Sequence, residues 1–394
     1  MPDTQDGRDP TLPIRRQVGE LEDSLIREIA HKGMRDPDII PLWFGEPDLP
    51  TPSFIISAAD QALRAGHTFY TPNLGIAILR ETLSKYMSDL YKSRIDVDRV
   101  AVTAAAMNGM MMIAEALIDP GDNIVAVTPV WPNFLRCVEI MGGQVRMAPL
   151  AANPSGWQLD LDQLFATCNQ QTRAIYINSP NNPTGWVMTK EEQRAVLDFC
   201  RQRGLWVISD EVYARIIYDD PLAPSFLQNA EPEDLVIVIN SFSKSWAMTG
   251  WRLGWITAPP RLIPIIERLN EYNVASPSTA AQHAGVTALR DGEFFVTSMV
   301  DRYRLARDIV HQRLGSMSRV HMPKPAAAFY AFFTVDGMTD SRRFAMQIMQ
   351  NTKVGLAPGL AFGAGGENYL RICYAKSPEF LGVALDRLAP MLDA

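Results

Sequence analysis

The stretch LVIVINSFSKSWAMTGWR, residues 235–252, decides the fold. Its first part is a continuous apolar run, which is typical of a strand buried in a parallel sheet. The run is followed at once by Lys244, which stands among small hydroxyl residues. Because ligands of open α/β sheets bind beyond the carboxyl ends of the strands, Lys244 is predicted to face a ligand site.

The residue types in this stretch indicate one kind of cofactor. Burial lowers the pKa of an amine, so that Lys244 can attack a carbonyl. A Thr-Gly pair lets the chain turn back and bring Arg252 near the lysine, and these cations suit a phosphate monoester together with Ser241 and Ser243. An aldehyde bound by lysine and a phosphate bound by arginine and serine describe pyridoxal 5′-phosphate, whose ring is an electron sink. The alternative is a solvated lysine and arginine on a surface loop.

The composition excludes several classes of function. The 394 residues are 47% hydrophobic and 21% charged, which suits a globular protein of two domains. A net charge of −7 without a dense basic cluster argues against nucleic-acid and membrane partners and favours small-molecule chemistry. Four widely spaced cysteines without a CxxC pair argue against a zinc site and a disulfide framework. With a polar N-terminus and no long apolar segment, the protein is predicted to be cytoplasmic.

Six strand-like runs alternate with segments of helix length through the middle of the chain, a pattern typical of parallel βαβ units. One helix is well marked, because Thr189 and Glu192 form a capping box and Gly204 follows its last residue. The predicted strands are residues 100–103, 123–128, 173–178, 205–209, 235–240 and 253–257.

The pattern changes from about Asp291 onward. A long amphipathic helix at 299–314 precedes short strands near 328–335 and 369–374 and a closing helix. The first forty or so residues hold one helix, near 21–34, which is too little for an independent domain. We therefore predict an α/β chain with a large cofactor-binding domain at 46–290. Residues 291–394 form a smaller α+β domain together with an N-terminal arm, 1–45.

Other predicted strand ends also carry polar or aromatic side chains. Asp210 can hold a pyridine nitrogen protonated, although a helix N-cap accounts for it equally well. Asn182 and Tyr213 can donate hydrogen bonds to a ring oxygen, while a turn chosen for its geometry is the alternative for the Asn-Pro segment. Trp131 can stack on the ring, although a core tryptophan is the more common explanation.

Two further groups suit anions. The backbone amides of Ala105, Ala106 and Met107 lie where a helix is predicted to begin, and their position there can bind a phosphate. The methionines that follow, at 110–112, are predicted to fill the core. Arg371 is a planar fork that pairs bidentately with a carboxylate, and its alternative is a surface ion pair.

Together and in their order, these motifs resemble those of the class I aminotransferases of fold type I, the aspartate-aminotransferase family, over nearly the whole chain. The resemblance implies a fold type I PLP transferase with a large, mostly parallel sheet domain and a smaller α+β domain. The matching elements are Gly45-Glu46-Pro47-Asp48 with Thr51-Pro52, Tyr70 before Gly75 and Leu79-Arg80, Asn178 to Gly185, Asp210 to Tyr213, the Ser-x-Ser-Lys with Arg252, and Leu370-Arg371-Ile372.

The resemblance also implies a role for each site residue. Lys244 forms the internal aldimine and moves the proton between Cα and the cofactor's C4′, while Asp210 pairs with the ring nitrogen. Arg371 binds the substrate α-carboxylate together with the Gly45 amide and Asn182. Tyr70 reaches the phosphate of the neighbouring subunit, so that a homodimer with two shared active sites is implied. Further cofactor contacts are implied for Ala105, Ala106, Met107, Trp131, Asn182, Tyr213, Ser241, Ser243 and Arg252.

One departure from the family bears on the substrate. Where many relatives carry Gly-Gly and then a hydroxyl residue or lysine, this chain has Ala-Ala and then Met107. In one branch that lysine helps to bind the distal carboxylate of aspartate, and a methionine cannot compensate a buried charge. A neutral or aromatic donor is therefore favoured over an acidic one. Arg15 or Arg16 of the arm can replace the missing cation, or the apolar residues near them can line a pocket for a neutral side chain.

The predicted reaction is the transfer of an amino group from an L-amino acid to a 2-oxo acid, by a ping-pong mechanism through Lys244. A C–S β-lyase of the same fold is the nearest alternative, because both reactions use the same cofactor chemistry. A regulatory module fused to a DNA-binding domain is a second, although only about forty residues precede Gly45. A silent binding protein is a third, against which the retained lysine, aspartate and arginines argue.

Overall fold

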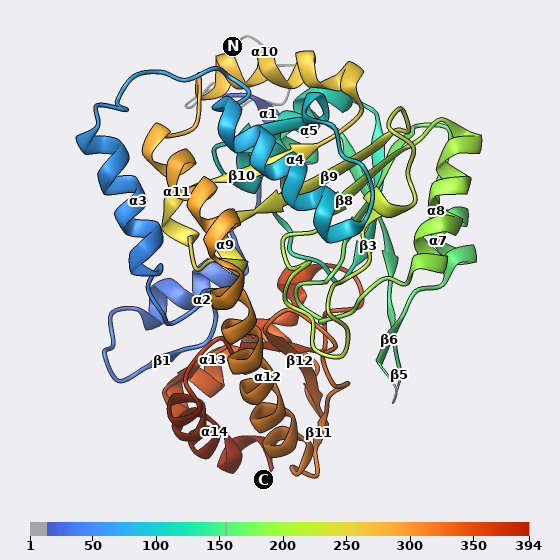
Figure 1. Cartoon of the computed structure of the whole chain (residues 1–394). Coiled ribbons are helices and arrows are strands. Elements are labelled where there is room, and N and C mark those ends of the chain that lie inside the picture. Colours follow the sequence, from blue (N-terminus) through green and yellow to red (C-terminus); the bar gives the residue numbers. More distant parts are fainter. Residues whose placement is uncertain (1–13, 154–155, 394) are drawn as a thin grey trace, which may run out of the picture.

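Two β-sheets of different size organise the chain (Figure 1). The computed structural model describes residues 14–153 and 156–393. In the larger sheet the strand pairs from β9 to β4 are parallel, whereas β10 runs antiparallel to both of its neighbours. The fold is therefore mixed α/β with a mostly parallel sheet, as predicted. In spatial order the seven strands are β2 (Val100–Thr103), β10 (Gly254–Thr257), β9 (Val236–Ser241), β8 (Trp206–Asp210), β7 (Thr172–Asn178), β3 (Asn123–Thr128) and β4 (Gln144–Pro149).

The predicted parallel pattern is wrong for the last of the six runs, which is β10. Between β9 and β10 the chain forms only the short helix α9 (Phe242–Ser245) and a 3-10 turn at Thr249–Trp251. A parallel connection needs a crossover of a dozen or more residues, usually with a full helix. The chain instead turns back, and Ile256 pairs with Ile239 in antiparallel register. This tight return holds Lys244 and Arg252 in one connection at the end of β9.

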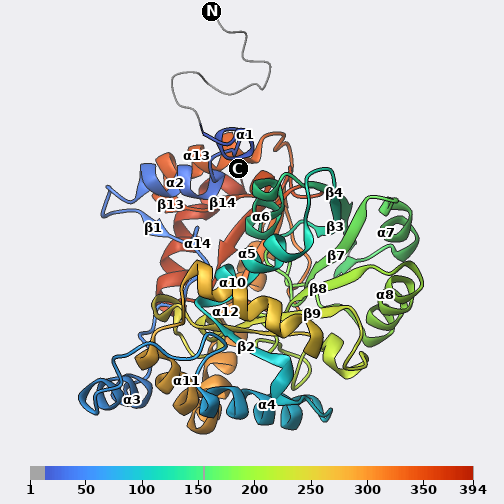
Figure 2. The same cartoon turned by 90° about the horizontal axis from the view of Figure 1, so that it is seen from above.

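Alternating residues of the central strands pack into two separate hydrophobic cores. In β3, Ile124 and Ala126 belong to one core, and Val125 and Val127 belong to the other. Both faces of the sheet are thus covered, which explains the unbroken apolar runs of its strands. Figure 2 shows helices on both sides of these strands. One face carries α5 (Ala105–Leu117), α6 (Asn133–Met141) and α10 (Ile263–Asn273), and the other carries α4 (Ala77–Tyr91), α7 (Leu161–Thr167), α8 (Lys190–Arg203) and α11 (Thr279–Asp291), on which α3 (Ser53–Arg64) packs.

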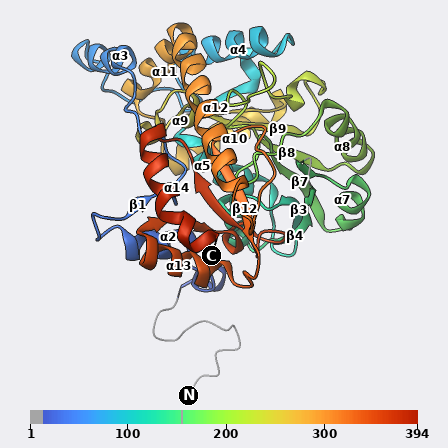
Figure 3. The same cartoon turned by 90° about the horizontal axis from the view of Figure 1, so that it is seen from below.

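The smaller sheet has a core of its own, which also takes in an N-terminal segment. Helix α2 (Leu25–Gly33) and Trp43 pack into this core, and strand β1 (Ile40–Pro41) pairs in parallel with β13 (Val354–Gly355). Figure 3 shows α2, α13 and α14 together at this end of the molecule. The packing agrees with the grouping of residues 1–45 and 291–394, although the domain division stays a prediction. The sheet order is β11 (Val320–His321), β12 (Tyr330–Val335), β15 (Leu370–Cys373) and β14 (Ala357–Pro358), with helices α12 (Glu293–Gly315), α13 (Ser341–Thr352) and α14 (Pro378–Leu392).

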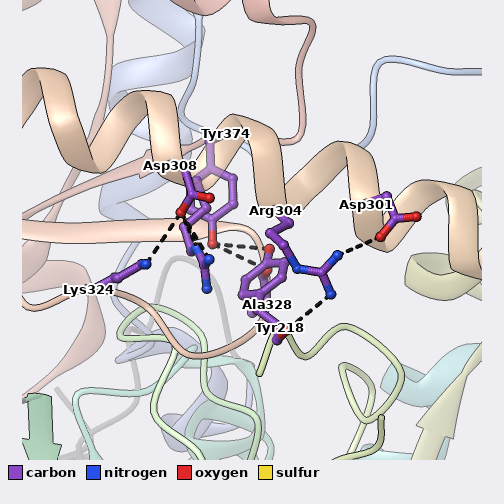
Figure 4. Close-up of polar contacts among 8 residues, drawn as sticks. Tyr218, Asp301, Arg304, Asp308, Lys324, Ala328 and Tyr374 are labelled. Carbon is purple, nitrogen blue, oxygen red and sulfur yellow. Dashed lines mark hydrogen bonds and ion pairs between the residues drawn. The ribbon is translucent and has the colours of Figure 1, made fainter. Parts of the chain in front are cut away.

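A polar cluster joins the loop after β8 to the smaller sheet and α12 (Figure 4). The hydroxyl of Tyr218 donates to the carbonyl of Ala328 and lies 3.2 Å from the hydroxyl of Tyr374. Arg304 donates to the Tyr218 carbonyl at 3.0 Å, and the Arg307 guanidinium lies 4.5 Å from the centre of the Tyr218 ring. Tyr218 therefore ties a loop of the larger sheet both to α12 and to the residue that follows β15.

The local signals of the sequence are confirmed with small shifts of boundary. Thr189 Oγ1 accepts from the Glu192 amide at 3.1 Å, Glu192 accepts from the Thr189 amide at 2.7 Å, and Gly204 ends α8 with φ of 65°. The helix predicted near 21–34 is α2, which Ser24 caps, and a short helix α1 (Arg16–Gly19) precedes it. Strand β4 was not predicted, because its half-exposed residues break the apolar pattern. Within the described ranges no helix has the length and apolar character needed to cross a membrane.

Candidate active site

A cavity of about 360 Å³ lies where β7, β8 and β9 end, between the two sheets. Of the residues predicted to form the site, Ala105 and Tyr70 do not line it. The predicted residues that do line it come from seven separate stretches of the sequence. The predicted residues that line it are Gly45, Ala106, Met107, Trp131, Asn182, Asp210, Tyr213, Ser241, Ser243, Lys244, Arg252 and Arg371.

Lys244 is partly buried in this cavity rather than solvated on a loop. Its Nζ donates to the carbonyl of Gly45 at 2.8 Å and lies 6.0 Å from the centre of the Tyr213 ring. Burial lowers the pKa of the lysine from 10.5 to about 8. At neutral pH the side chain is still mostly protonated, but its free-amine fraction, which attack on an aldehyde requires, is far larger than at the usual pKa of 10.5.

Asp210 ends β8 with its carboxylate buried at 2% exposure. The Tyr176 hydroxyl and the Val212 amide each donate to it at 3.2 Å. Burial raises its pKa from 3.8 to about 6, so that the group is mostly ionised at neutral pH. A turn and not a helix follows, so the N-cap alternative is wrong. The carboxylate is placed to accept a hydrogen bond from a cationic ring nitrogen.

Arg371 lies on β15 and is only 2% exposed, which rules out the surface ion pair. Its Nη1 donates to Asn182 Oδ1 at 2.9 Å, and its Nη2 donates to the carbonyl of Trp43. Among the described residues, its Nε has no hydrogen-bond partner. A buried guanidinium without a carboxylate partner is costly, so this geometry suits an anion that arrives from the cavity.

Tyr330 of β12 belongs to the site but was not predicted. Its hydroxyl lies 2.7 Å from the hydroxyl of Tyr213, and the Arg371 guanidinium lies 4.5 Å from the centre of its ring. A Cβ atom on Gly45 would stand 1.7 Å from the Tyr330 hydroxyl oxygen, so any side chain at Gly45 would displace this tyrosine. Tyr330 lies within a continuous apolar run, where its hydroxyl gives no signal of a binding role.

A second end of the cavity offers donors for a phosphate. Ser241 Oγ donates to Ser243 Oγ at 2.9 Å and accepts from the Ser243 amide at 3.1 Å. Arg252 donates to the carbonyl of Thr249 in the same connection. The first turn of α5 brings Ala106 and Met107 to the cavity wall. The residues predicted for a phosphate are thus together, apart from Ala105, which is buried below with a left-handed φ of 78°.

Trp131 and Tyr70 lie in different surroundings. The backbone amide of Trp131 donates to the carbonyl of Asn182 at 2.9 Å, and Trp131 lines the cavity. Tyr70 is 91% exposed beside Phe69, which is 81% exposed, away from the cavity of its own chain. Its position suits a contact with a second chain but not with the cofactor site of its own.

Arg15 and Arg16, which the sequence offered as replacements for the missing cation, lie away from the cavity. Arg15 donates to the carbonyl of Ile140 at 2.8 Å, Arg16 pairs with Glu20 at 2.8 Å, and neither lines the cavity. Residues 12 and 13 lie outside the described residues. Arg27 of α2, which the sequence did not single out, does line the cavity, beside Phe44. Its position depends on how α2 packs, and no local motif marks it.

Known proteins match this chain over nearly its whole length. The family model for aminotransferase class I and II matches residues 37–388. The chain is 35% identical over 383 residues to an aspartate aminotransferase of Pyrococcus horikoshii. The aligned residues cover 96% of this chain and 97% of that relative. It is 34% identical to aromatic-amino-acid aminotransferase 2 of Thermococcus litoralis, over 97% of this chain and 98% of the relative.

Solved structures agree with these relatives. The crystal structure of an aspartate aminotransferase from Thermotoga maritima matches with a TM-score of 0.90 at 33% identity, over 97% of this chain and 100% of that one. The shared fold extends over both sheets and not over one of them alone. Because family, sequence and fold agree from end to end, the chain belongs to the class I and II aminotransferases, which transfer amino groups with pyridoxal 5′-phosphate.

Proposed function

We propose that this cavity binds pyridoxal 5′-phosphate and transfers an amino group from an L-amino acid to a 2-oxo acid in two half-reactions. The observation that carries the proposal is the position of Lys244. Its amine has a pKa lowered to about 8 and shares one cavity with the buried carboxylate of Asp210 and the guanidinium of Arg371.

The donor set fits the cofactor at both ends. Ser241, Ser243 and Arg252 offer hydroxyl and guanidinium donors to a phosphate, and the start of α5 offers amides. Arg252 has no carboxylate partner among the described residues, so its charge is available to an anion. The amine of Lys244 is the group that an aldehyde requires.

The chemistry then divides among residues of this chain. The bound cofactor supplies a ring that withdraws electrons from the substrate Cα. Asp210 keeps a proton on the ring nitrogen, because an ionised buried carboxylate stabilises the cation beside it. Arg371 fixes the substrate carboxylate with Asn182, so that the Cα–H bond is oriented for removal. With the cofactor bound, Lys244 would take that proton from the substrate Cα and return it on the cofactor side, a role suited to a pKa near the working pH.

The wall near the substrate favours a neutral or aromatic donor. Ile26, Phe44, Met107 and Trp131 line the cavity with apolar surface. The acceptor is 2-oxoglutarate or another oxo acid. The named relatives are aminotransferases, which favours transamination over the C–S β-lyase. A cytoplasmic location stays a prediction.

A homodimer is the proposed working state. Tyr70 and Phe69 are almost fully exposed, and Leu63 nearby is 50% exposed. Side chains of this kind gather at protein interfaces, and a tyrosine is suited to reach the phosphate in a second subunit. A monomeric form is therefore expected to bind the cofactor weakly.

The test is absorbance of the protein with added pyridoxal phosphate while amino acids are titrated without acceptor. Conversion of the cofactor to its amine form, with release of the matching oxo acid, supports the proposal. Lys244→Ala is expected to slow both half-reactions on the order of 10³-fold, whereas Lys190→Ala, on the exposed start of α8, leaves them unchanged. A Lys244→Ala protein that works at the wild-type rate, or steady release of pyruvate and ammonia without acceptor, would contradict it.

A further inference from the structure

We propose that Arg27 binds the side-chain carboxylate of a dicarboxylic substrate, such as 2-oxoglutarate, in the cavity. This inference rests on the proposed function, because it names the substrate class of the same site. Four cationic side chains line the cavity, and three of them have a partner in that function: Lys244 takes the aldehyde, Arg252 the phosphate and Arg371 the α-carboxylate. Arg27 is the fourth.

The packing of α2 places Arg27 at the cavity. The N-cap Ser24 accepts a hydrogen bond from the Arg27 amide, and Ile26 and Ile29 are buried in the core of the smaller sheet. The side chain of Arg27 is exposed, and its guanidinium lies 5.8 Å from the centre of the Phe44 ring. Phe44 directly precedes Gly45, whose carbonyl accepts from Lys244. The core contacts of α2 thus hold the Arg27 guanidinium over Phe44, the residue directly before the hydrogen-bond partner of Lys244.

The guanidinium of Arg27 is free to bind an anion. No carboxylate of the described residues lies within ion-pair distance of it, whereas its neighbour Glu28 is already paired with Lys32 and Arg342. The ring of Phe44 orients a guanidinium without neutralising it. Among the described residues that line the cavity, Asp210 is the only carboxylate, and its proposed place is at the ring nitrogen.

The balance of charge leads to the same substrate class. A phosphate monoester brings about two negative charges and the α-carboxylate brings one, which Arg252, Arg371 and the α5 amides can meet. A second substrate carboxylate beside the apolar Met107 would be unpaired and therefore costly to bind. Arg27 supplies the one remaining cation, and it can form a bidentate pair with a carboxylate.

The experiment compares two ligands that cannot react. Glutarate carries two carboxylates, and pentanoate has the same carbon chain with one. Their dissociation constants for the cofactor-loaded protein are measured by isothermal titration calorimetry, for the wild type, Arg27→Met, Arg27→Lys and the matched control Arg16→Met. Arg16 lies on the same arm, exposed and outside the cavity. A second readout is the KM for 2-oxoglutarate beside the rate of the half-reaction with an aromatic donor.

Arg27→Met is expected to raise the dissociation constant of glutarate by about tenfold or more, as for loss of a charge-assisted hydrogen bond. The dissociation constant of pentanoate should change by less than about twofold. Arg27→Lys should lose less affinity for glutarate than Arg27→Met, and Arg16→Met should bind glutarate as tightly as the wild type. The KM for 2-oxoglutarate should rise while the aromatic half-reaction keeps its rate. Glutarate affinity that survives Arg27→Met within about twofold, or equal wild-type affinity for both ligands, would overturn the inference.

The two proposals fail in different ways. A wild-type protein that releases no oxo acid from any amino donor contradicts the proposed function itself. A wild-type protein that transaminates, together with an Arg27→Met protein that binds glutarate unchanged, contradicts only the assignment of Arg27.

Discussion

Replacement of Glu211 by glutamine is expected to stabilise the protein, and increasingly so as the pH rises. Glu211 follows the site residue Asp210 but is 1% exposed and faces the core. Its Oε1 accepts from Ser209 Oγ at 3.0 Å and from the Phe226 amide at 3.2 Å, whereas Oε2 has no hydrogen-bond partner in the part of the chain that the structure describes. Burial raises the pKa of this carboxyl from 4.5 to about 7.

The direction of the effect follows from proton binding. Between pH 4.5 and about 7 the folded state keeps a proton on Glu211 that the unfolded state has lost, so the contribution of this group falls as the pH rises. Above about pH 7 both states are ionised, and the folded state carries the full penalty. This shift in pKa corresponds to a loss of at most about 3 kcal/mol in the free energy of unfolding.

Glutamine removes this titration and keeps the two contacts of Oε1. Its new amide group lies in the small cavity that Asn240 also lines, and Asn240 Oδ1 lacks a partner as well. From pH 5 to pH 8 the gain of Glu211→Gln in the free energy of unfolding should grow by about 2 to 3 kcal/mol. For a chain of this length that is about 3 °C in Tm.

The assay is thermal and urea unfolding at pH 5 and pH 8, with protein and cofactor concentrations held fixed because both affect apparent stability. Glu81→Gln is the matched control, since Glu81 is exposed on α4. The reasoning is refuted if Glu211→Gln changes stability equally at both pH values, or if it destabilises the protein at pH 8.

Two other substitutions test backbone strain and the joint between the sheets. Ala105→Gly should stabilise the protein by about 0.5 to 1 kcal/mol, because a left-handed φ of 78° is unfavourable for alanine by more than glycine loses in entropy; a lower urea midpoint would contradict this. Tyr218→Phe should lower the free energy of unfolding by about 1 to 2 kcal/mol, because the hydroxyl contacts with Ala328 and Tyr374 are lost. Tyr272→Phe, at an 87% exposed position, is its control, and equal midpoints for both variants would contradict the role of the cluster.

The sequence predicts best the residues that follow buried strands. Lys244 and Asp210 come directly after unbroken apolar runs, and the carboxyl ends of parallel strands meet at one edge of a sheet. Their mutual proximity therefore follows from the strand pattern without further knowledge. The direction of β10 was mispredicted because its apolar run looks like a parallel strand, whereas its short connection decides the pairing.

Residues placed by tertiary packing could not be predicted in the same way. Tyr176 and Tyr330 lie within apolar strands, where a tyrosine that serves the core and one that serves the site look alike in sequence. Arg27 is one of several charged residues on an amphipathic helix, and only the docking of α2 onto the smaller sheet shows which of them faces the cavity. Arg15 and Arg16 carry the same positive charge as Arg27, but they contact the Ile140 carbonyl and Glu20 outside the cavity.

The partners of Arg371 imply that substrate and fold stabilise each other. This arginine belongs to the smaller sheet, yet it donates to Asn182 at the end of β7 and to Trp43 of the N-terminal segment. Its unpartnered Nε makes the assembled arrangement costly without an anion. A substrate carboxylate that completes this set therefore binds most tightly when all three segments are in place. If Arg371 binds the α-carboxylate as proposed, the binding free energy there would help to hold the two sheets in the arrangement that places Lys244 in the cavity, since a ligand stabilises the state to which it binds.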